Sequence, residues 1–308
     1  MDATDLGLMA LFAGSAIRLA MPMLFGALGE LVSERAGVLN LSLEGMMLLG
    51  AFAGAMGSLA TGSPMLGLLI AVIAVVPVAL LQAFLSVTLQ ANQIVSGIGI
   101  NILVLGATTV AYRELLGNRS RTQIPGFDKI DPPLLGDIPV VGQAIFVQSW
   151  MVYLAFAAAV AVWLVMRGTA LGLTIHAAGT HPQALDKSGG SVVRVRYGAV
   201  MFAGAMSALG GAFLSLSDIQ TFTEGMTSGV GYLALVGVIF GNWKVWRTVF
   251  ACLFFGAATA LQFQLPAMGI EVSNALLIML PYVMALLAVA GLVGRQTAPP
   301  GLTLPYSR

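Results

Sequence analysis

The chain has 308 residues, of which 58% are apolar and 9% are charged, and its mean hydropathy is +0.93. Soluble globular chains carry about 25% charged residues, so this composition, spread over nearly the whole length, predicts a polytopic membrane protein. The net charge of +1 provides no basic surface for nucleic acid, and the single cysteine excludes an internal disulfide.

Apolar runs between polar breaks predict about nine membrane segments in an all-α helical bundle that forms one domain over 1–308. The runs lie at 6–28, 37–61, 65–89, 92–112, 146–166, 198–217, 229–241, 248–266 and 272–293. The seventh run has about 13 residues, which is too short for a straight crossing. We therefore expect a broken or re-entrant helix there.

Lysine and arginine predict the sidedness of these segments, because cytoplasmic loops are enriched in both. In the nine-segment arrangement one side carries nine of the 14 basic residues and the other side carries four. This difference predicts an N-terminus outside the cell, a cytoplasmic C-terminus and a cytoplasmic loop at 167–197. The longest outer loop, 113–145, is rich in proline and glycine, which indicates turns and not a separate domain.

The second run keeps polar residues within the apolar stretch 33–54, among them Asn40 and Glu44. A carboxylate inside an apolar segment costs roughly 2.5–3.5 kcal/mol unless it finds water or a partner. Two interpretations of Glu44 stay open: it lines a solute pathway, or it lies near the interface or caps a broken half-helix. Farther along, Gly50 and Gly54 form a Gly-x-x-x-Gly pair, which is typical of close helix packing.

The fourth run opens with amides and glycines, including Gln93 and the deeper Asn101. Lipid cannot satisfy these groups, so we expect them to face other helices or a wet pathway. Both interpretations stay open for Asn101.

Glycines are dense in the stretch 222–243, where Gly229 and Gly231 precede the seventh apolar run. Such density predicts unwound backbone at a discontinuous helix, as transporters use near their substrate sites. Gly237 and Gly241 repeat the spacing of the earlier Gly-x-x-x-Gly pair, which is a faint indication of duplicated halves.

The cytoplasmic loop predicts a short helix at 182–188, because Pro182 can start a helix and Gly189 can end it. A small knob of this kind is suited to dock into another protein, although an ordinary capped connector has the same composition. His176 and His181 lie five positions apart and have no third ligand nearby, so we expect no metal site.

The sequence also lacks motifs for energy conversion or catalysis. A phosphate-binding loop needs Gly-Lys-Ser/Thr, but the three lysines follow Asp, Asp and Trp. Neither His-Glu-x-x-His nor Gly-x-Ser-x-Gly occurs. We therefore expect a transport subunit that is not an enzyme, holds no cofactor and takes its energy from another chain.

Four collinear blocks resemble the permease subunits of bacterial ABC importers in the branched-chain amino acid and ribose permease superfamily, particularly the simple-sugar and nucleoside type. The blocks are SERAGVLNLSLEGMMLLGAFAGA, NQIVSGIGINIL, AAGTHPQALDKSGGSVVRVRYGAVMFAGAMSALGGAFLSL and GMTSGVGYLALVGVIFGNW. Together they extend the resemblance over about 18–292, in the order and spacing of the family.

The resemblance implies a subunit in the bacterial inner membrane that forms half of a pathway for a nucleoside or a simple sugar. Its implied partners are a second related permease, a cytoplasmic ATPase that uses ATP, and an outer solute-binding protein. An ion-coupled secondary transporter that works without an ATPase is the alternative.

The resemblance also implies that the ATPase-coupling segment falls on 179–190. Its candidate residues are Gly179, Thr180, His181, Pro182, Ala184, Asp186, Ser188 and Gly189. The usual family pattern has other residues at several of these positions, which indicates that docking to the ATPase has drifted. The candidate pathway or gating residues are Asn40, Glu44, Gln93, Asn101, Gly229 and Gly231.

Overall fold

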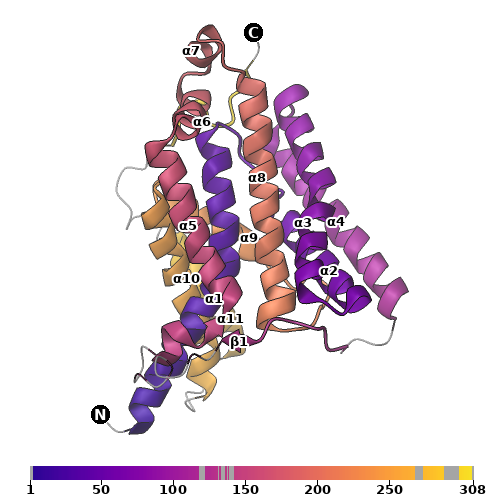
Figure 1. The fold of residues 1–308 in the computed structure, drawn as a ribbon, viewed down its shortest axis with the longest axis vertical. Coiled ribbons are helices and arrows are strands. Elements are labelled where there is room, and N and C mark those ends of the chain that lie inside the picture. Colours follow the sequence, from indigo (N-terminus) through magenta and orange to yellow (C-terminus); the bar gives the residue numbers. More distant parts are fainter. Residues whose placement is uncertain are drawn as a thin grey trace.

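The computed structural model describes residues 3–117, 122–130, 132, 136, 138, 142–267, 273–287 and 298–306. Over these ranges the chain is an elongated bundle of helices with one short pair of strands (Figure 1). The described part holds seven helices that are long and apolar enough to cross a membrane, with two shorter apolar helices. The predicted all-α membrane bundle is therefore confirmed.

The elements follow one another along the described chain with short connections. The α-helices are α1 (Ala3–Arg35), α2 (Leu43–Thr61), α3 (Pro64–Ala83), α4 (Gln93–Leu116), α5 (Trp150–Gly168), α6 (Ala170–Thr180), α7 (Pro182–Lys187), α8 (Val192–Phe213), α9 (Val230–Phe240), α10 (Val245–Ala267) and α11 (Asn274–Leu287). Three π-helical turns are η1 (Phe84–Thr88), η2 (Gly142–Phe146) and η3 (Leu214–Asp218). Strands β1 (Lys129–Ile130) and β2 (Gln148–Ser149) pair antiparallel.

Each predicted membrane segment overlaps one helix, but two boundaries differ from the prediction. Helix α1 continues to Arg35, seven residues beyond the predicted end at 28, because Glu30 and Glu34 are buried within the protein. Helix α2 begins at Leu43, so the stretch 36–42 is not helical. The predicted inner loop 167–197 holds α6, α7 and the start of α8.

Helices α2 and α8 form the interior of the bundle, and small residues allow them to touch. A Cβ added to Gly50 would lie 2.6 Å from the Cα of Ala208, and one added to Gly211 would overlap the carbonyl oxygen of Met47. Backbone atoms cannot move aside as a flexible side chain can, so any larger residue would separate the two helices. Gly50 therefore serves helix packing.

The two halves of the bundle are arranged as an inverted repeat. Helix α1 runs toward the end where α7 and the C-terminus lie, here called the α7 end, whereas α8 runs away from it (Figure 1). Helix α1 packs on α10 as α8 packs on α3, and α1 and α8 contact each other. The glycine pairs at 50 and 54 and at 237 and 241 lie 7 and 11 positions after the first residues of α2 and α9. The contacts supply the support that glycine spacing alone lacked.

Two crossings of the bundle combine a non-helical half with a helical half: 36–42 precedes α2, and 219–229 precedes α9. Helix α9 has 11 residues, so it spans about 16 Å at 1.5 Å per residue, roughly half of a bilayer core. Its far end is held by Trp243, whose Nε1 donates to Glu34 of α1. The expected discontinuous helix is therefore confirmed as a broken crossing.

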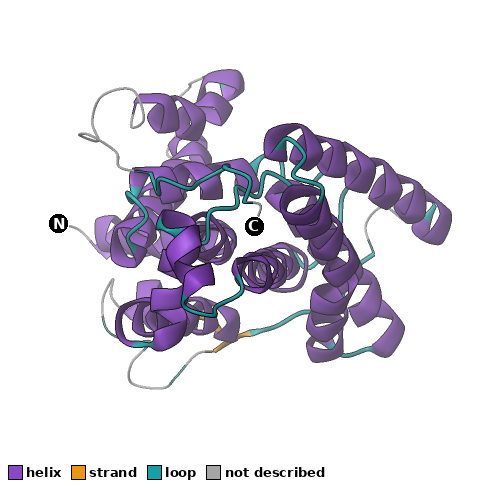
Figure 2. Ribbon diagram, turned by 90° about the horizontal axis from the view of Figure 1, so that it is seen from above, coloured by secondary structure: helices purple, strands orange, loops and turns teal. Residues whose placement is uncertain are grey.

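Viewed along the long axis, several helices appear nearly end-on while others are clearly tilted (Figure 2). The described part of the chain shows no separate soluble unit beside the bundle (Figure 2). Function must therefore be sought within the bundle and in the short segments at its two ends.

Candidate functional site

Glu44 lies where the two broken crossings meet. It stands in the first turn of α2, and its carboxylate accepts hydrogen bonds from the first turn of α9. Gly229 N donates to Oε1 at 2.8 Å, and Gly231 N donates to Oε2 at 2.7 Å. Gly229 has φ of 88°, a left-handed conformation that glycine adopts without strain. Of the two interpretations left open, the structure supports the helix cap.

This geometry explains how a carboxylate is tolerated inside an apolar segment without a cation. Helix N-termini carry unpaired N–H groups and a partial positive charge, so they stabilise a negative charge placed against them. Glu44 receives this stabilisation from the N-termini of both α2 and α9. The same carboxylate thereby fixes the start of α9 relative to α2, which makes the contact between the two inverted halves specific.

The predicted amide residues complete this junction by satisfying the unwound stretch 36–42. The Asn101 side chain accepts from Gly45 N at 2.8 Å and donates to the carbonyl of Leu41 at 2.9 Å. The Gln93 side chain accepts from Leu39 N at 2.8 Å. Non-helical backbone at membrane depth persists only where such groups satisfy it. The amides thus make the interhelical contacts that were one of the two alternatives.

Asn40 lies within the same stretch and is fully buried. Its backbone N donates to Glu30 Oε1 of α1 at 2.8 Å, and its side-chain oxygen accepts from Ser42 Oγ at 2.5 Å. Asn40 therefore anchors the unwound stretch to α1. The assignment of the six predicted residues as pathway-lining or gating remains a prediction.

Sequence reasoning missed Glu30 and Glu34, which lie one turn apart on α1 and are both buried. Glu30 holds the unwound stretch 36–42, whereas Glu34 holds Trp243 at the end of α9. Two acids spaced four residues apart share one face of a helix. That spacing was visible in the sequence and could have identified them.

Two exposed tyrosines flank the Glu44 junction and were also missed. Tyr232 and Tyr282 are 42% and 39% exposed. The hydroxyl of Tyr282 donates to the Ser228 carbonyl at 2.6 Å, and the hydroxyl of Tyr232 accepts from Asn101 at 2.9 Å. Aromatic rings with fixed hydroxyls, beside a half-buried carboxylate, form a surface that can hold a polar solute through both its faces and its edges.

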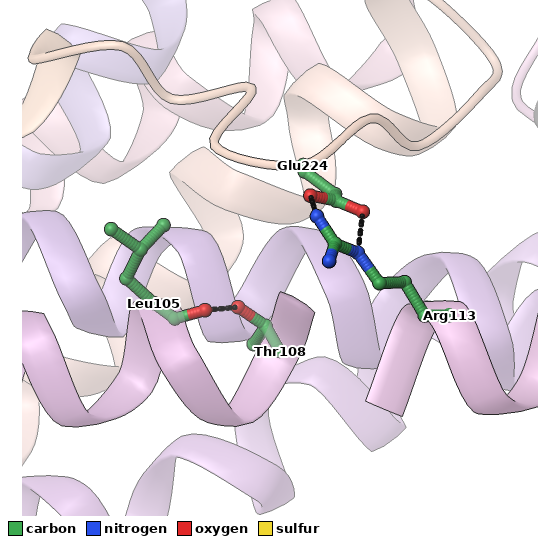
Figure 3. A network of polar contacts seen from close by, with 4 residues as sticks. All are labelled: Leu105, Thr108, Arg113 and Glu224. Carbon is green, nitrogen blue, oxygen red and sulfur yellow. Dashed lines mark hydrogen bonds and ion pairs between the residues drawn. The ribbon is translucent and has the colours of Figure 1, made fainter. Parts of the chain in front are cut away.

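The same non-helical segment carries an exposed ion pair nearer the end opposite α7. Figure 3 shows Arg113 of α4 reaching Glu224, with guanidinium–carboxylate distances of 2.8 and 2.9 Å. Thr108, one turn earlier on α4, donates to the Leu105 carbonyl at 3.1 Å (Figure 3). The ion pair therefore ties 219–229 to α4.

We expect Arg113→Gln and Glu224→Gln each to lower uptake severalfold while leaving stability nearly unchanged, because exposed ion pairs contribute little to folding. The exchange Arg113→Glu with Glu224→Arg should restore most of the uptake by remaking the tether. Labelled-solute uptake and thermal unfolding in detergent measure the two effects. A stable exchange variant that stays as inactive as the single variants would refute the tether.

The predicted coupling segment protrudes at the α7 end of the bundle (Figure 1). Its first residue, Gly179, is buried, and a Cβ there would overlap the carbonyl oxygen of Arg35. The other predicted residues lie in the turn that carries α7: Thr180, His181, Pro182, Ala184, Asp186, Ser188 and Gly189. Pro182 is the first residue of α7, close to where the short helix is predicted.

Residues 298–306 form a strap beneath this segment. Gly301 N donates to the Gly179 carbonyl at 2.8 Å, and Thr303 N donates to the Gly37 carbonyl at 3.2 Å. Arg196 of α8 donates to the Leu304 carbonyl at 3.0 Å. The base of the coupling segment is thus joined to α1, α8 and the strap, so a force on α7 reaches the spanning helices.

His176, on α6, faces the end of α1. Its Nδ1 lies 3.1 Å from the Arg35 guanidinium, whose other nitrogens donate to the Trp243 carbonyl. Partial burial lowers the pKa of His176, and the positive charges of Arg35 and His181 lower it further. The folded chain therefore favours the neutral imidazole at this contact.

A lowered pKa disfavours protonation of the folded state, so stability falls as pH drops below the usual histidine value of about 6.5. We expect the melting temperature to fall between about pH 7.5 and about pH 5.5, and to fall less in His176→Gln. The effect should be small because the side chain is largely exposed. His181→Gln, which leaves the Arg35 contact intact, is the control, and an equal reduction in both variants would contradict the assignment.

Taken together, inverted halves, broken helices that meet at the centre and a protruding helical turn define a membrane transport protein. A family model described as branched-chain amino acid transport system / permease component matches residues 12–289. The chain belongs to this family of transport permeases. It is a multi-pass membrane protein and a transport subunit, as predicted.

Relatives with names carry the comparison further. The chain is 37% identical to the guanosine ABC transporter permease protein NupQ of Bacillus subtilis over 297 residues, 93% of each chain. It is 37% identical to the putative glucose ABC transporter permease protein TsgC13 of Haloferax volcanii, over 80% of this chain and 75% of the relative. It is 31% identical to the nucleoside ABC transporter permease protein NupC of Lactococcus lactis, over 90% of each. No solved structure matches the chain significantly.

Proposed function

We propose that this chain is the permease subunit of an ABC importer and forms half of the pathway for a nucleoside, with a simple sugar as the second candidate. The observation that carries the solute class is the pair of exposed tyrosines beside Glu44 at the broken-helix junction. Aromatic rings stack on nucleobases, and fixed hydroxyl and carboxylate groups bind ribose hydroxyls. The relatives named for guanosine and nucleosides support this order of candidates.

A second permease completes the pathway in this proposal, a cytoplasmic ATPase supplies the energy from ATP, and an outer binding protein delivers the solute. The protruding α7 and the strap beneath it support the ATPase contact, since they join an exposed helix to the ends of α1 and α8. This chain would then hold no cofactor of its own. Its role is alternating access, driven through 179–190.

The proposed orientation places the α7 end in the cytoplasm and the N-terminus outside. Basic residues support it, since Arg167, Lys187, Arg194 and Lys244 all lie at the ends of helices or in α7 on that side. The ATPase contact requires the same orientation. Accessibility to a membrane-impermeant label at an introduced cysteine in α7 measures it directly.

The deciding experiment is uptake of labelled nucleosides and sugars in a strain that lacks this chain, with and without restoring it. Ligand binding by the partner binding protein identifies the solute. Nucleoside uptake that depends on this chain and on ATP supports the proposal. Uptake by this chain alone in vesicles, abolished by an ionophore and indifferent to ATP, would instead establish an ion-coupled secondary transporter.

A further inference from the structure

A basic pocket lies at the α7 end of the bundle, apart from the Glu44 junction and the exposed surface of α7. It encloses about 800 Å³ between the ends of α1, α5 and α9 and the starts of α6 and α10. Its basic lining residues are Arg35, Arg167, His176, Lys244 and Arg247. No acidic side chain is among the lining residues, so the pocket carries concentrated positive charge.

Most of this charge is not neutralised within the protein. In the described part of the chain, Arg167, Lys244 and Arg247 form no ion pair, and only Arg167 has a printed contact, above the ring of Trp163 at 5.2 Å. Arg35 donates to a carbonyl oxygen, which leaves its charge uncompensated. Clustered cations without anions favour binding of an anionic group.

The position of the pocket identifies the source of that anion. Arg35 ends α1, Gly168 ends α5 and Val245 begins α10, so three spanning helices meet the aqueous phase here. Two tryptophans, Trp163 and Trp246, pack with ring centroids 6.2 Å apart. Tryptophan is enriched at the membrane–water boundary, where lipid headgroups lie.

We propose that this pocket binds the phosphate headgroup of an anionic phospholipid from the leaflet at the α7 end. Basic pockets between membrane helices on the cytoplasmic side recognise such headgroups. The tryptophan rings and Met166 provide apolar walls against which the upper acyl chains rest. Because α6 forms one wall and continues into the coupling segment, the bound lipid steadies the base of α7.

Native mass spectrometry of the full chain in detergent tests the site with phosphatidylglycerol as probe and phosphatidylcholine as the neutral comparison. Each basic side chain near a membrane surface contributes about fivefold to anionic lipid binding, so Arg167→Gln with Arg247→Gln should weaken phosphatidylglycerol binding about thirtyfold. The matched control, Lys187→Gln with Arg194→Gln, removes two exposed charges outside the pocket and should leave binding unchanged. Equal phosphatidylcholine binding in all variants shows that they remain folded.

Three outcomes would overturn the proposal. Equal loss of phosphatidylglycerol in both double variants would mean that general surface charge attracts the lipid. Displacement by inorganic phosphate at millimolar concentration would identify a site for a free anion. Loss of bound phosphatidylglycerol when the ATPase is added would show that a protein partner occupies the pocket.

Discussion

Glu44→Gln is expected to reduce uptake at least tenfold and to lower the stability of the permease by about 2 kcal/mol, since hydrogen bonds to charged groups contribute about 1.5–3 kcal/mol. The carboxylate accepts from the backbone N–H groups of both Gly229 and Gly231. A glutamine side chain has one acceptor oxygen and an NH2 group that cannot accept, so one N–H at the start of α9 loses its partner. Thermal unfolding in detergent and labelled-solute uptake measure the two losses.

Glu114→Gln is the matched control, because Glu114 lies exposed on α4 and its change should alter neither quantity. Gly231→Ala tests the same junction from the other side. A Cβ there would lie 2.7 Å from Glu44 Oε2 and 2.8 Å from Glu44 Cα, so α9 must move away from α2. Wild-type uptake and melting temperature in both Glu44→Gln and Gly231→Ala would show that the junction does not position α9.

Gly179→Ala is expected to abolish uptake and to prevent ATP hydrolysis from being coupled to it. The new methyl group would overlap the Arg35 carbonyl oxygen, which belongs to the last residue of α1. Relief requires the end of α6 to tilt away, which also breaks the bond from Gly301 N. Overpacking costs about 1–3 kcal/mol, and here it falls on the base of the coupling segment. Membrane insertion should be unaffected.

The control for this variant is Gly198→Ala on α8, where an added Cβ meets no heavy atom within 4 Å and alanine favours the helix. Pro182→Ala removes the residue that starts α7 and should weaken association with the ATPase without disturbing α1. Co-purification of the ATPase and solute-stimulated ATP hydrolysis separate these effects. Unchanged transport and hydrolysis in both Gly179→Ala and Pro182→Ala would falsify the coupling assignment.

Apolar runs predicted each membrane helix because lipid and close packing both require long apolar segments, whatever their neighbours. The boundaries were less predictable. The first run was ended at 28, before the polar residues Glu30 and Glu34, yet α1 continues through both. Their carboxyls are held by Asn40 N and by Trp243, and neither partner is near in sequence.

The roles of the polar residues were less predictable still. Glu44, Gln93 and Asn101 were recognised as unusual because each sits in an apolar run, but their sequence positions do not say what they face. The structure brings them to one junction, where they satisfy backbone that is not helical. The basic pocket had no sequence signal either, since its lining comes from five separate helices.

The sequence by itself determined that the chain crosses the membrane repeatedly, where it does so, and which end carries the positive charge. These properties depend on local composition, which each segment carries independently of the others. Only the tertiary structure decided that the two broken crossings meet at Glu44, that the halves are inverted and that the strap supports α7. Those contacts join residues up to 187 positions apart, and no local pattern records which distant backbone group a buried side chain must satisfy.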